Sequence, residues 1–357
     1  MIDRHERAKP EFRAEQLVGP QIGRLAEHGV LAGMVGVMPP QRTTLTARSG
    51  HVIEKTAVDQ FGLPYQDMVA AVRSAVPAEV NRVTGRVVDF TSDVDRQDVA
   101  LADGRTVSAR LLVLATGVPT TLAKQAGLAF RTIRADHSLT LGFDLASEKT
   151  SAVPPLVYFP PTTRDRVDYL AVFGMVGRMR ANLFCYHPPG SDWVRAFRQD
   201  PTTRLRAVLP GLESVFGPLD VQSSVEVRSN DLRVASDPVR DGVVLLGDAF
   251  QTPCPSAGTG IDRLLSDVAA LGRHAPGWFA TPGIGRAKIA AFYADSAKVA
   301  ADAEALRVAE YRRSVSLETS LGWRLHRTQV LLRRRLRSAA LGLLRGPRDA
   351  ATVVPST

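Results

Sequence analysis

Cysteine is scarce in this chain of 357 residues, which carries only Cys185 and Cys254. The two cysteines lie far apart and form no CxxC pair, which argues against a disulfide framework and against a structural zinc site. No apolar run reaches about 18 residues, so no transmembrane helix is predicted. The first residues are charged and lack the apolar core of a signal peptide. These absences together favour a protein of the reducing cytoplasm, with no metal centre.

The chain does have the composition of a globular protein, with 45% hydrophobic and 23% charged residues, which suffices for a sizeable core. Its length favours two domains, or one large domain with an insertion. The net charge of +9 comes mostly from arginine, much of it in the C-terminal tail. A basic surface can attract nucleic acid or anionic lipid. Because no nucleic-acid-binding motif accompanies the arginines, we expect no nucleic acid partner and interpret the tail first as a solvated face of a peripheral helix.

The most informative stretch runs from residue 243 to residue 262. An apolar run rich in β-branched residues predicts a buried strand, which ends at Gly247 and Asp248 and is followed by a loop rich in proline and glycine. A helical pattern then begins at about Ile261. A strand, a glycine loop and a helix N-terminus together bind anions, because free amides and the positive end of the helix dipole point into the loop. Gly258 and Gly260 would let a flat ligand approach the backbone closely. The alternative is an ordinary strand–loop–helix connection in an α/β domain.

This stretch resembles the Gly-Asp signature of the class A flavoprotein monooxygenases, the para-hydroxybenzoate hydroxylase group. The matching positions are Gly247, Asp248, Ala249, Pro255, Gly258 and Gly260, whereas Phe250, Gln251 and Asp262 depart from the family pattern. The resemblance implies that Asp248 meets the ribityl-pyrophosphate region of FAD. It also implies that the loop from Pro255 through Thr259 to Gly260 lies against the isoalloxazine ring.

The resemblance extends to the first residues of the chain. Asp3 stands where the family has an acidic residue that holds the adenosine ribose. Arg13 takes the position of an arginine over the FAD pyrophosphate, and we expect it to open a helix whose apolar residues continue to Leu31. The glycine fingerprint GxGxxG, which normally precedes the acidic residue by about 20 residues, is absent. We therefore expect either a start site placed too late or a truncated relative without the first βαβ half. We also expect the chain as given to bind FAD weakly or not at all.

Two further matches lie between these ends. Gln66, near the start of a predicted amphipathic helix, takes the place of a residue that helps to bind the FAD phosphates, although an ordinary glutamine of a first helical turn is the alternative. Thr116 and Gly117 follow a predicted strand at the position of the family's Ala-Asp-Gly motif. Because Thr116 replaces the aspartate, the inference of direct reduction by NADPH is weakened. A flavin-dependent reductase or dehydrogenase on the same fold therefore stays open.

We expect an α/β fold: a Rossmann-like FAD-binding domain whose first βαβ half is missing, an inserted β-rich substrate domain, and C-terminal helices. The expected ranges are 1–134 for the first part of the FAD-binding domain (with a β-hairpin of the substrate side at 39–60), 135–234 for the substrate domain, 235–275 for the second part, and 276–357 for the C-terminal helices with the basic tail. Five aromatic residues in predicted strands are candidate walls of an apolar pocket over the flavin: Phe143, Tyr158, Tyr169, Phe173 and Phe184. The basic pattern at 317–344 carries a leucine stripe and could pack as an arm, pair with a partner chain, or lie on an anionic membrane surface.

The implied function is that of an FAD-dependent oxidoreductase. The first hypothesis is a monooxygenase that hydroxylates a small hydrophobic organic substrate through a flavin C4a-hydroperoxide, with NAD(P)H as a candidate electron donor. A flavin-dependent reductase or dehydrogenase is the second hypothesis. A truncated, non-catalytic relative that acts as a binding protein is the third. No catalytic acid or base is assigned from the sequence, and Cys254 is interpreted as a small buried residue that fills space.

Overall fold

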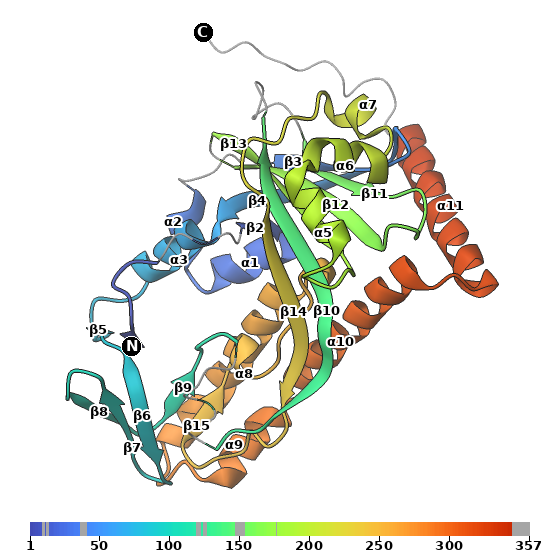
Figure 1. Cartoon of the computed structure of the whole chain (residues 1–357). Coiled ribbons are helices and arrows are strands. Elements are labelled where there is room, and N and C mark those ends of the chain that lie inside the picture. The colour runs from blue at the N-terminus through green and yellow to red at the C-terminus, as the bar shows by residue number, and fades with distance from the viewer. Residues whose placement is uncertain are drawn as a thin grey trace.

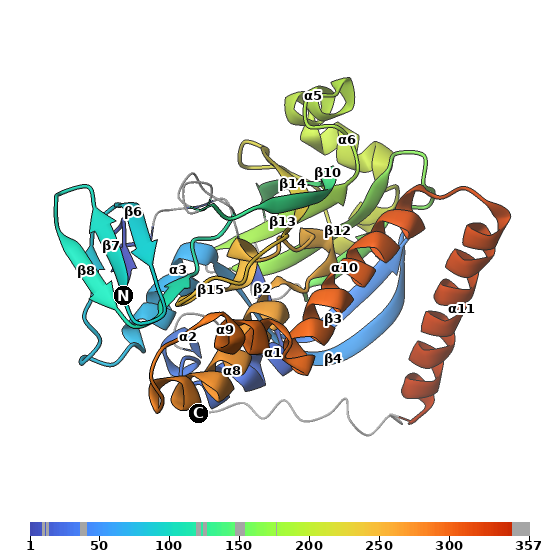
Figure 2. The same cartoon turned by 90° about the horizontal axis from the view of Figure 1, so that it is seen from below.

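The computed structural model describes residues 1–8, 11, 14–35, 41–118, 123, 127–146, 154–175 and 177–344. An eight-stranded sheet forms the centre of the molecule (Figures 1 and 2), in the order β14-β10-β13-β12-β11-β3-β4-β2. Its neighbouring strands are antiparallel except for the parallel pair β11 and β3. The strands are β2 (Ala14–Val18), β3 (Gln41–Arg48), β4 (His51–Pro64), β10 (Phe130–Leu145), β11 (Leu156–Phe159), β12 (Val167–Met175), β13 (Arg178–Cys185) and β14 (Glu226–Ala235).

One face of this sheet is covered by three short helices, α5 (Asp192–Gln199), α6 (Pro201–Val208) and α7 (Leu212–Phe216). The side chain of Ser191 caps α5 and that of Asp200 caps α6, which satisfies amides at both helix starts. Phe143 and Tyr158 lie in the apolar core beneath these helices, and the Phe143 ring packs 5.9 Å from that of Phe197. The expectation that Phe143 and Tyr158 line the pocket over the flavin is therefore wrong, because their strands turn these side chains toward the helical face.

Two short parallel pairs lie outside the large sheet. The strand β1 (Ile2–Asp3) pairs with β5 (Val83–Thr84), and β9 (Leu112–Leu114) pairs with β15 (Val243–Leu245). A separate antiparallel sheet contains β6 (Val87–Ser92), β7 (Gln97–Leu101) and β8 (Thr106–Ala109). The mixed α/β class that we expected is confirmed, whereas the loss of a first βαβ half stays a prediction.

The remaining helices lie mainly on the other side of the large sheet (Figure 2). They are α1 (Gly19–Glu27), α2 (Ala32–Val35), α3 (Tyr65–Ser74), α8 (Gly260–Phe279), α9 (Arg286–Tyr293), α10 (Ser296–Leu317) and α11 (Leu321–Leu344). Within the described ranges, no helix combines the length and the apolar character needed to cross a membrane.

Residues 14–18 correct the prediction of a helix that starts at Arg13. They form the edge strand β2, which pairs with β4 from Ala14 opposite Pro64 to Val18 opposite Gln60. The side chain of Leu17 is buried against the start of α3 and the adjoining helices. Helix α1 begins only at Gly19, with Pro20 in its first turn, where a missing N–H costs nothing. Pairing with β4 therefore decides the conformation of a stretch whose own spacing also fits a helix.

Two of the expected domain boundaries fall within strands of the large sheet. The limit between residues 134 and 135 falls inside β10, and that between 234 and 235 falls at the end of β14. The stretch at 39–60 corresponds largely to β3 and β4, which join the same sheet as β10 to β13. The chain thus passes from one expected domain to the other along strands, without a linker.

Candidate functional site

The strand β15 leads into a tight turn at Gly247 and Asp248. Gly247 has φ +60°, a left-handed conformation that favours glycine, and it opens a single 3-10 turn from Gly247 to Ala249. Its amide donates a hydrogen bond of 2.8 Å to the buried carboxylate of Asp267. The carboxylate of Asp248 is half-buried and lies 3.4 Å from the guanidinium of Arg263. The turn is therefore fixed from beneath by charged side chains.

These charged side chains form a buried ion cluster, which we define as Arg263, Asp267, Lys298 and Asp302. Arg263 and Lys298 are 1% exposed and Asp267 is fully buried. The Lys298 ammonium lies 2.8 Å from Asp267 and 2.9 Å from Asp302, and Arg263 lies 3.3 Å from Asp302. Arg263 also donates to the carbonyl of Gln251, so α8 and α10 are both tied to the Gly247 turn.

Sequence reasoning missed the ion cluster. Its signal in the sequence is two opposite-charge pairs at i,i+4 spacing, Arg263 with Asp267 and Lys298 with Asp302. Such pairs are common on solvated helix faces and contribute little there. Only the packing of α10 against α8 shows that these four side chains face one another in the interior.

The loop after the turn has the features that a flat ligand needs. Pro255 to Ala257 form a second 3-10 turn, and Gly258 follows with φ +67° and open space around the position of an added Cβ. Thr259 precedes α8, and its hydroxyl is buried without a hydrogen-bond partner among the described residues. Gly260 begins α8, a helix of 20 residues whose free amides face the loop. An exposed glycine, an unsatisfied hydroxyl and a helix N-terminus thus fit an FAD at this place.

A cavity of about 260 Å³ lies between this loop and the large sheet. Tyr169 of β12 lines it, and the Tyr169 hydroxyl donates a hydrogen bond of 2.9 Å to the carbonyl of Ser256. The guanidinium of Arg312 lies 4.6 Å from the centre of the Tyr169 ring. Phe184, a second expected wall residue, packs behind Tyr169 at 4.8 Å between ring centres. The described residues that line the cavity are Thr46, Val157, Phe159, Tyr169, Ser256, Ala257, Arg312 and Arg334.

A fully satisfied carboxylate, that of Asp168, holds Arg312 beside the cavity. Asp168 accepts hydrogen bonds from Arg312, from the Ser316 hydroxyl at 3.0 Å and from the Tyr186 hydroxyl at 3.2 Å. Burial raises the pKa of both Tyr169 and Tyr186, so both hydroxyls stay protonated and available as donors. Neither Asp168 nor Arg312 was singled out from the sequence, since 144 residues separate them.

Two groups behind the loop are held neutral. The Cys254 thiol lies 3.3 Å from the Ser138 hydroxyl and 3.2 Å from that of Ser256, and burial raises its pKa. A protonated thiol in a closed pocket agrees with a space-filling role. His137 is fully buried next to Tyr186, and burial lowers its pKa to about 4. At neutral pH the region beneath the loop therefore carries no imidazolium and no thiolate.

The other expected site residues fall into two groups. Thr116, which is exposed, and Gly117, with φ +76°, follow β9, and the amide of Leu246 bonds to the carbonyl of Leu114, so this turn lies beside the Gly247 turn. Asp3 lies on β1 instead and forms an ion pair with Arg73 of α3. Gln66 is half-buried in the first turn of that same helix, whereas Arg13 lies outside the described residues. The structure thus brings Thr116 and Gly117 to the Gly247 turn, and Asp3 to the helix that carries Gln66.

Comparisons with known proteins identify solved structures of similar fold. HpxO from Klebsiella pneumoniae, crystallised with FAD, is similar at a TM-score of 0.70 and 18% identity, over 95% of this chain and 91% of that one. The 2,6-dihydroxypyridine-3-hydroxylase from Arthrobacter nicotinovorans is similar at a TM-score of 0.66 and 15% identity, over 90% and 87% of the two chains. The p-nitrophenol 4-monooxygenase PnpA from Pseudomonas putida DLL-E4 is similar at a TM-score of 0.64 and 16% identity, over 97% of this chain and 92% of that one.

These likenesses show a shared fold. No curated protein matches the sequence significantly. A family model described as an FAD binding domain matches residues 1–275, which is more than half of the chain. The chain therefore belongs to the FAD binding domain family, the family of the class A flavoprotein monooxygenases.

Proposed function

We propose that this protein is an FAD-dependent hydroxylase of small aromatic molecules. The observation that carries the proposal is the cavity of about 260 Å³ directly beside Ser256 and Ala257, the loop that the family places against the flavin ring. Tyr169 and Phe159 supply aromatic walls against which a planar organic molecule can pack. In support, HpxO was crystallised with FAD and uric acid, and the names of the two other similar proteins state activities on p-nitrophenol and on a dihydroxypyridine.

FAD would be held by the turn and loop already described. The Asp248 carboxylate would accept hydrogen bonds from ribityl hydroxyls, and the amides at the start of α8 would face the negative part of the cofactor. Exposed Gly258 would let the ring system lie flat on the backbone. We assign supporting contacts to Asp3, Gln66, Thr116 and Gly117 on their places in the family pattern. The bound cofactor supplies the redox chemistry, and the protein supplies orientation and electrostatics.

The side chains around the cavity would position the substrate. Tyr169 fixes the loop through its bond to the Ser256 carbonyl. Arg312, held by Asp168, keeps a positive charge over the Tyr169 ring, where it would stabilise negative charge on a phenolate or a similar oxygen of the substrate. We further propose NAD(P)H as the electron donor and a hydrophobic ring as the body of the substrate. A contact with a membrane or a partner protein through the basic C-terminal helix is also a proposal.

Titration with FAD tests the first step. We expect binding, followed by flavin absorbance after gel filtration, and a loss of about 10-fold or more in affinity for Asp248→Asn, because a charge-assisted hydrogen bond contributes about 1.5–3 kcal/mol. Asp237→Asn is the matched control, since that carboxylate is exposed and forms its ion pair with nearby Arg240. Absence of FAD binding at any cofactor concentration would overturn the proposed function.

The reaction is tested with the FAD-loaded protein. We expect NAD(P)H oxidation stimulated by a small phenol or hydroxypyridine, with one hydroxyl added to the ring as measured by mass spectrometry. Oxidation of NAD(P)H with reduction of an added acceptor and no hydroxylated product would favour the reductase or dehydrogenase instead. Binding of FAD without either reaction would favour a non-catalytic relative.

A further inference from the structure

Helix α11 presents a row of leucines to solvent. The leucine stripe, which we define as Leu321, Leu325, Leu332 and Leu336, is 69%, 55%, 56% and 60% exposed. At 3.6 residues per turn these four positions fall within an arc of about 60° on the helix. Single exposed leucines are ordinary, but four on one helix face form a continuous apolar ridge.

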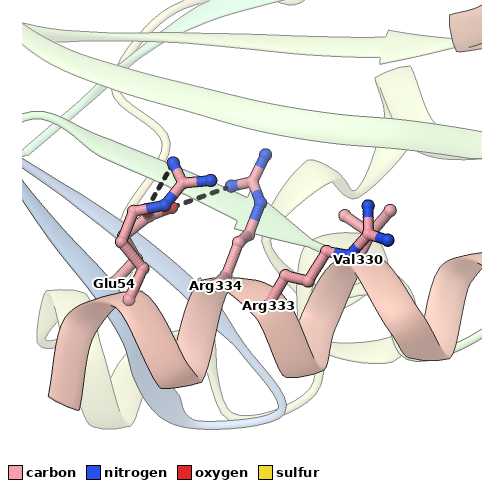
Figure 3. Close-up of a pocket in the computed structure, with 5 residues that line it drawn as sticks. Glu54, Val330, Arg333 and Arg334 are labelled. Carbon is pink, nitrogen blue, oxygen red and sulfur yellow. Dashed lines mark ion pairs between the residues drawn. The ribbon is translucent and has the colours of Figure 1, made fainter. Parts of the chain in front are cut away.

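The opposite face of α11 is tied to the body of the protein. Arg334 and Arg337 each lie 3.5 Å from the carboxylate of Glu54 on β4, and the three side chains border a cavity of about 280 Å³ together with Val330 and Arg333 (Figure 3). Arg327 donates to the carbonyl of Glu318 at 2.8 Å. These contacts fix the rotation of the helix about its axis. They therefore turn the leucine stripe away from the sheet, on an arm that extends from the end of α10 (Figure 2).

The charge of α11 has one sign. The helix contains six arginines and neither aspartate nor glutamate: Arg324, Arg327, Arg333, Arg334, Arg335 and Arg337. By helical spacing Arg324 and Arg335 flank the leucine stripe on one side and Arg333 flanks it on the other, and all three are exposed. An apolar ridge between rows of arginine is the pattern of a helix that lies in the interface of a membrane.

We propose that α11 binds the surface of an anionic lipid membrane, with the leucine stripe at the boundary between headgroups and acyl chains. The flanking arginines would contact lipid phosphates. This inference rests on α11 alone and holds whichever reaction the protein catalyses.

The charge distribution favours lipid over the other candidate partners. A second copy of the chain, docked stripe to stripe, would place two arginine-rich helices against each other, and like charges at such a contact are unfavourable. A nucleic acid would neutralise the arginines but would leave the leucines in water. An anionic bilayer covers both the apolar ridge and the positive charges at once.

Vesicle flotation with the full-length protein tests the proposal. We expect at least 10-fold stronger partitioning to vesicles of phosphatidylcholine with about 30% phosphatidylglycerol than to phosphatidylcholine alone, because the leucine stripe by itself binds weakly without charge attraction. Raising NaCl from about 0.1 M to about 0.5 M should release the protein, since the Debye length then shrinks to a few ångströms.

Two double variants separate the contributions. Leu325→Gln with Leu332→Gln, and Arg324→Gln with Arg335→Gln, should each reduce partitioning at least 10-fold, and circular dichroism should be unchanged because all four side chains are exposed. Val299→Gln is the control, an apolar side chain of α10 that is 49% exposed. Equal partitioning to both kinds of vesicle, or wild-type partitioning of the leucine variant, would overturn the proposal. So would a dimer in light scattering that the leucine variant abolishes while neither protein binds vesicles, because the stripe would then belong to a second copy.

Discussion

Lys298→Met is the substitution that tests the ion cluster most directly. Methionine keeps most of the aliphatic volume of lysine and a high helix propensity, so α10 itself should be little affected. The change removes the ammonium that lies 2.8 Å from Asp267 and 2.9 Å from Asp302, and 3.9 Å above the Phe250 ring. Asp267 and Asp302 would then share only Arg263, which also pairs with Asp248.

The size of the effect follows from this geometry. Wild-type charges of Arg263 and Lys298 balance those of Asp267 and Asp302, so the variant leaves one uncompensated negative charge in a region where Asp267 is fully buried. Removing one partner of a buried ion pair costs about 3–5 kcal/mol. We therefore expect the free energy of unfolding to fall by about that amount. The double variant Lys298→Met with Asp302→Asn should regain part of the loss, because the excess charge disappears.

Urea unfolding followed by fluorescence measures this change. Arg307→Met is the matched control on the same helix, because Arg307 pairs with Glu304 at 67% and 52% exposure and such pairs contribute at most about 1 kcal/mol. FAD affinity should fall in Lys298→Met and not in Arg307→Met, since Asp267 also holds the amide of Gly247. If Lys298→Met destabilises no more than Arg307→Met does, the Lys298 ammonium does not stabilise the ion cluster.

Two further predictions concern single residues. The folded-state pKa of His137 is about 4, below its ordinary value of 6.5. As the pH falls, the unfolded chain therefore takes up a proton at this imidazole before the folded protein does. The free energy of unfolding should not depend on this group above pH 6.5 and should fall between pH 6.5 and pH 4. Between pH 7 and pH 5 the free energy of unfolding, measured in urea, should therefore fall by about 2 kcal/mol less in His137→Phe than in the wild type. Equal decreases in the two proteins would contradict the lowered pKa of His137. Gly211→Ala should destabilise by about 3 kcal/mol or more, because φ is +78° and the new Cβ would lie 2.6 Å from the Gly50 nitrogen. Gly29 has φ +71° and open space around an added Cβ, so Gly29→Ala should lower the free energy of unfolding by only about 1 kcal/mol. Similar decreases in Tm for the two variants would refute the steric argument.

The parts of the site that could be predicted are those formed by residues that are consecutive in the sequence. The strand at 243–245, the Gly247 turn and the helix from Gly260 each carry a local signal: a β-branched run, a glycine and a helical period. Their order along the chain identifies the site because the ligand-binding edge of a parallel pair lies at its carboxyl end.

The parts that could not be predicted depend on partners far away in the sequence. Residues 14–18 fit a helical spacing, but pairing with β4 makes them a strand. Tyr158 and Phe159 are neighbours, yet Tyr158 enters the apolar core and Phe159 lines the cavity, and only the pairing of β11 with β3 and β12 decides which does which. The burial of Lys298 likewise follows from the packing of two helices, which no local pattern encodes.

The ion cluster also bears on where this protein can be divided. The family model ends at residue 275, but Lys298 and Asp302 lie beyond that limit and complete the charges beneath Gly247. A fragment cut at residue 275 would keep Arg263 and Asp267 and lose their partners from α10. It would also uncover Leu232 and Cys254, which pack against Ala309. The segment that the family model matches is therefore shorter than the unit that packs together, because α10 completes both the ion cluster and the apolar contacts around Cys254.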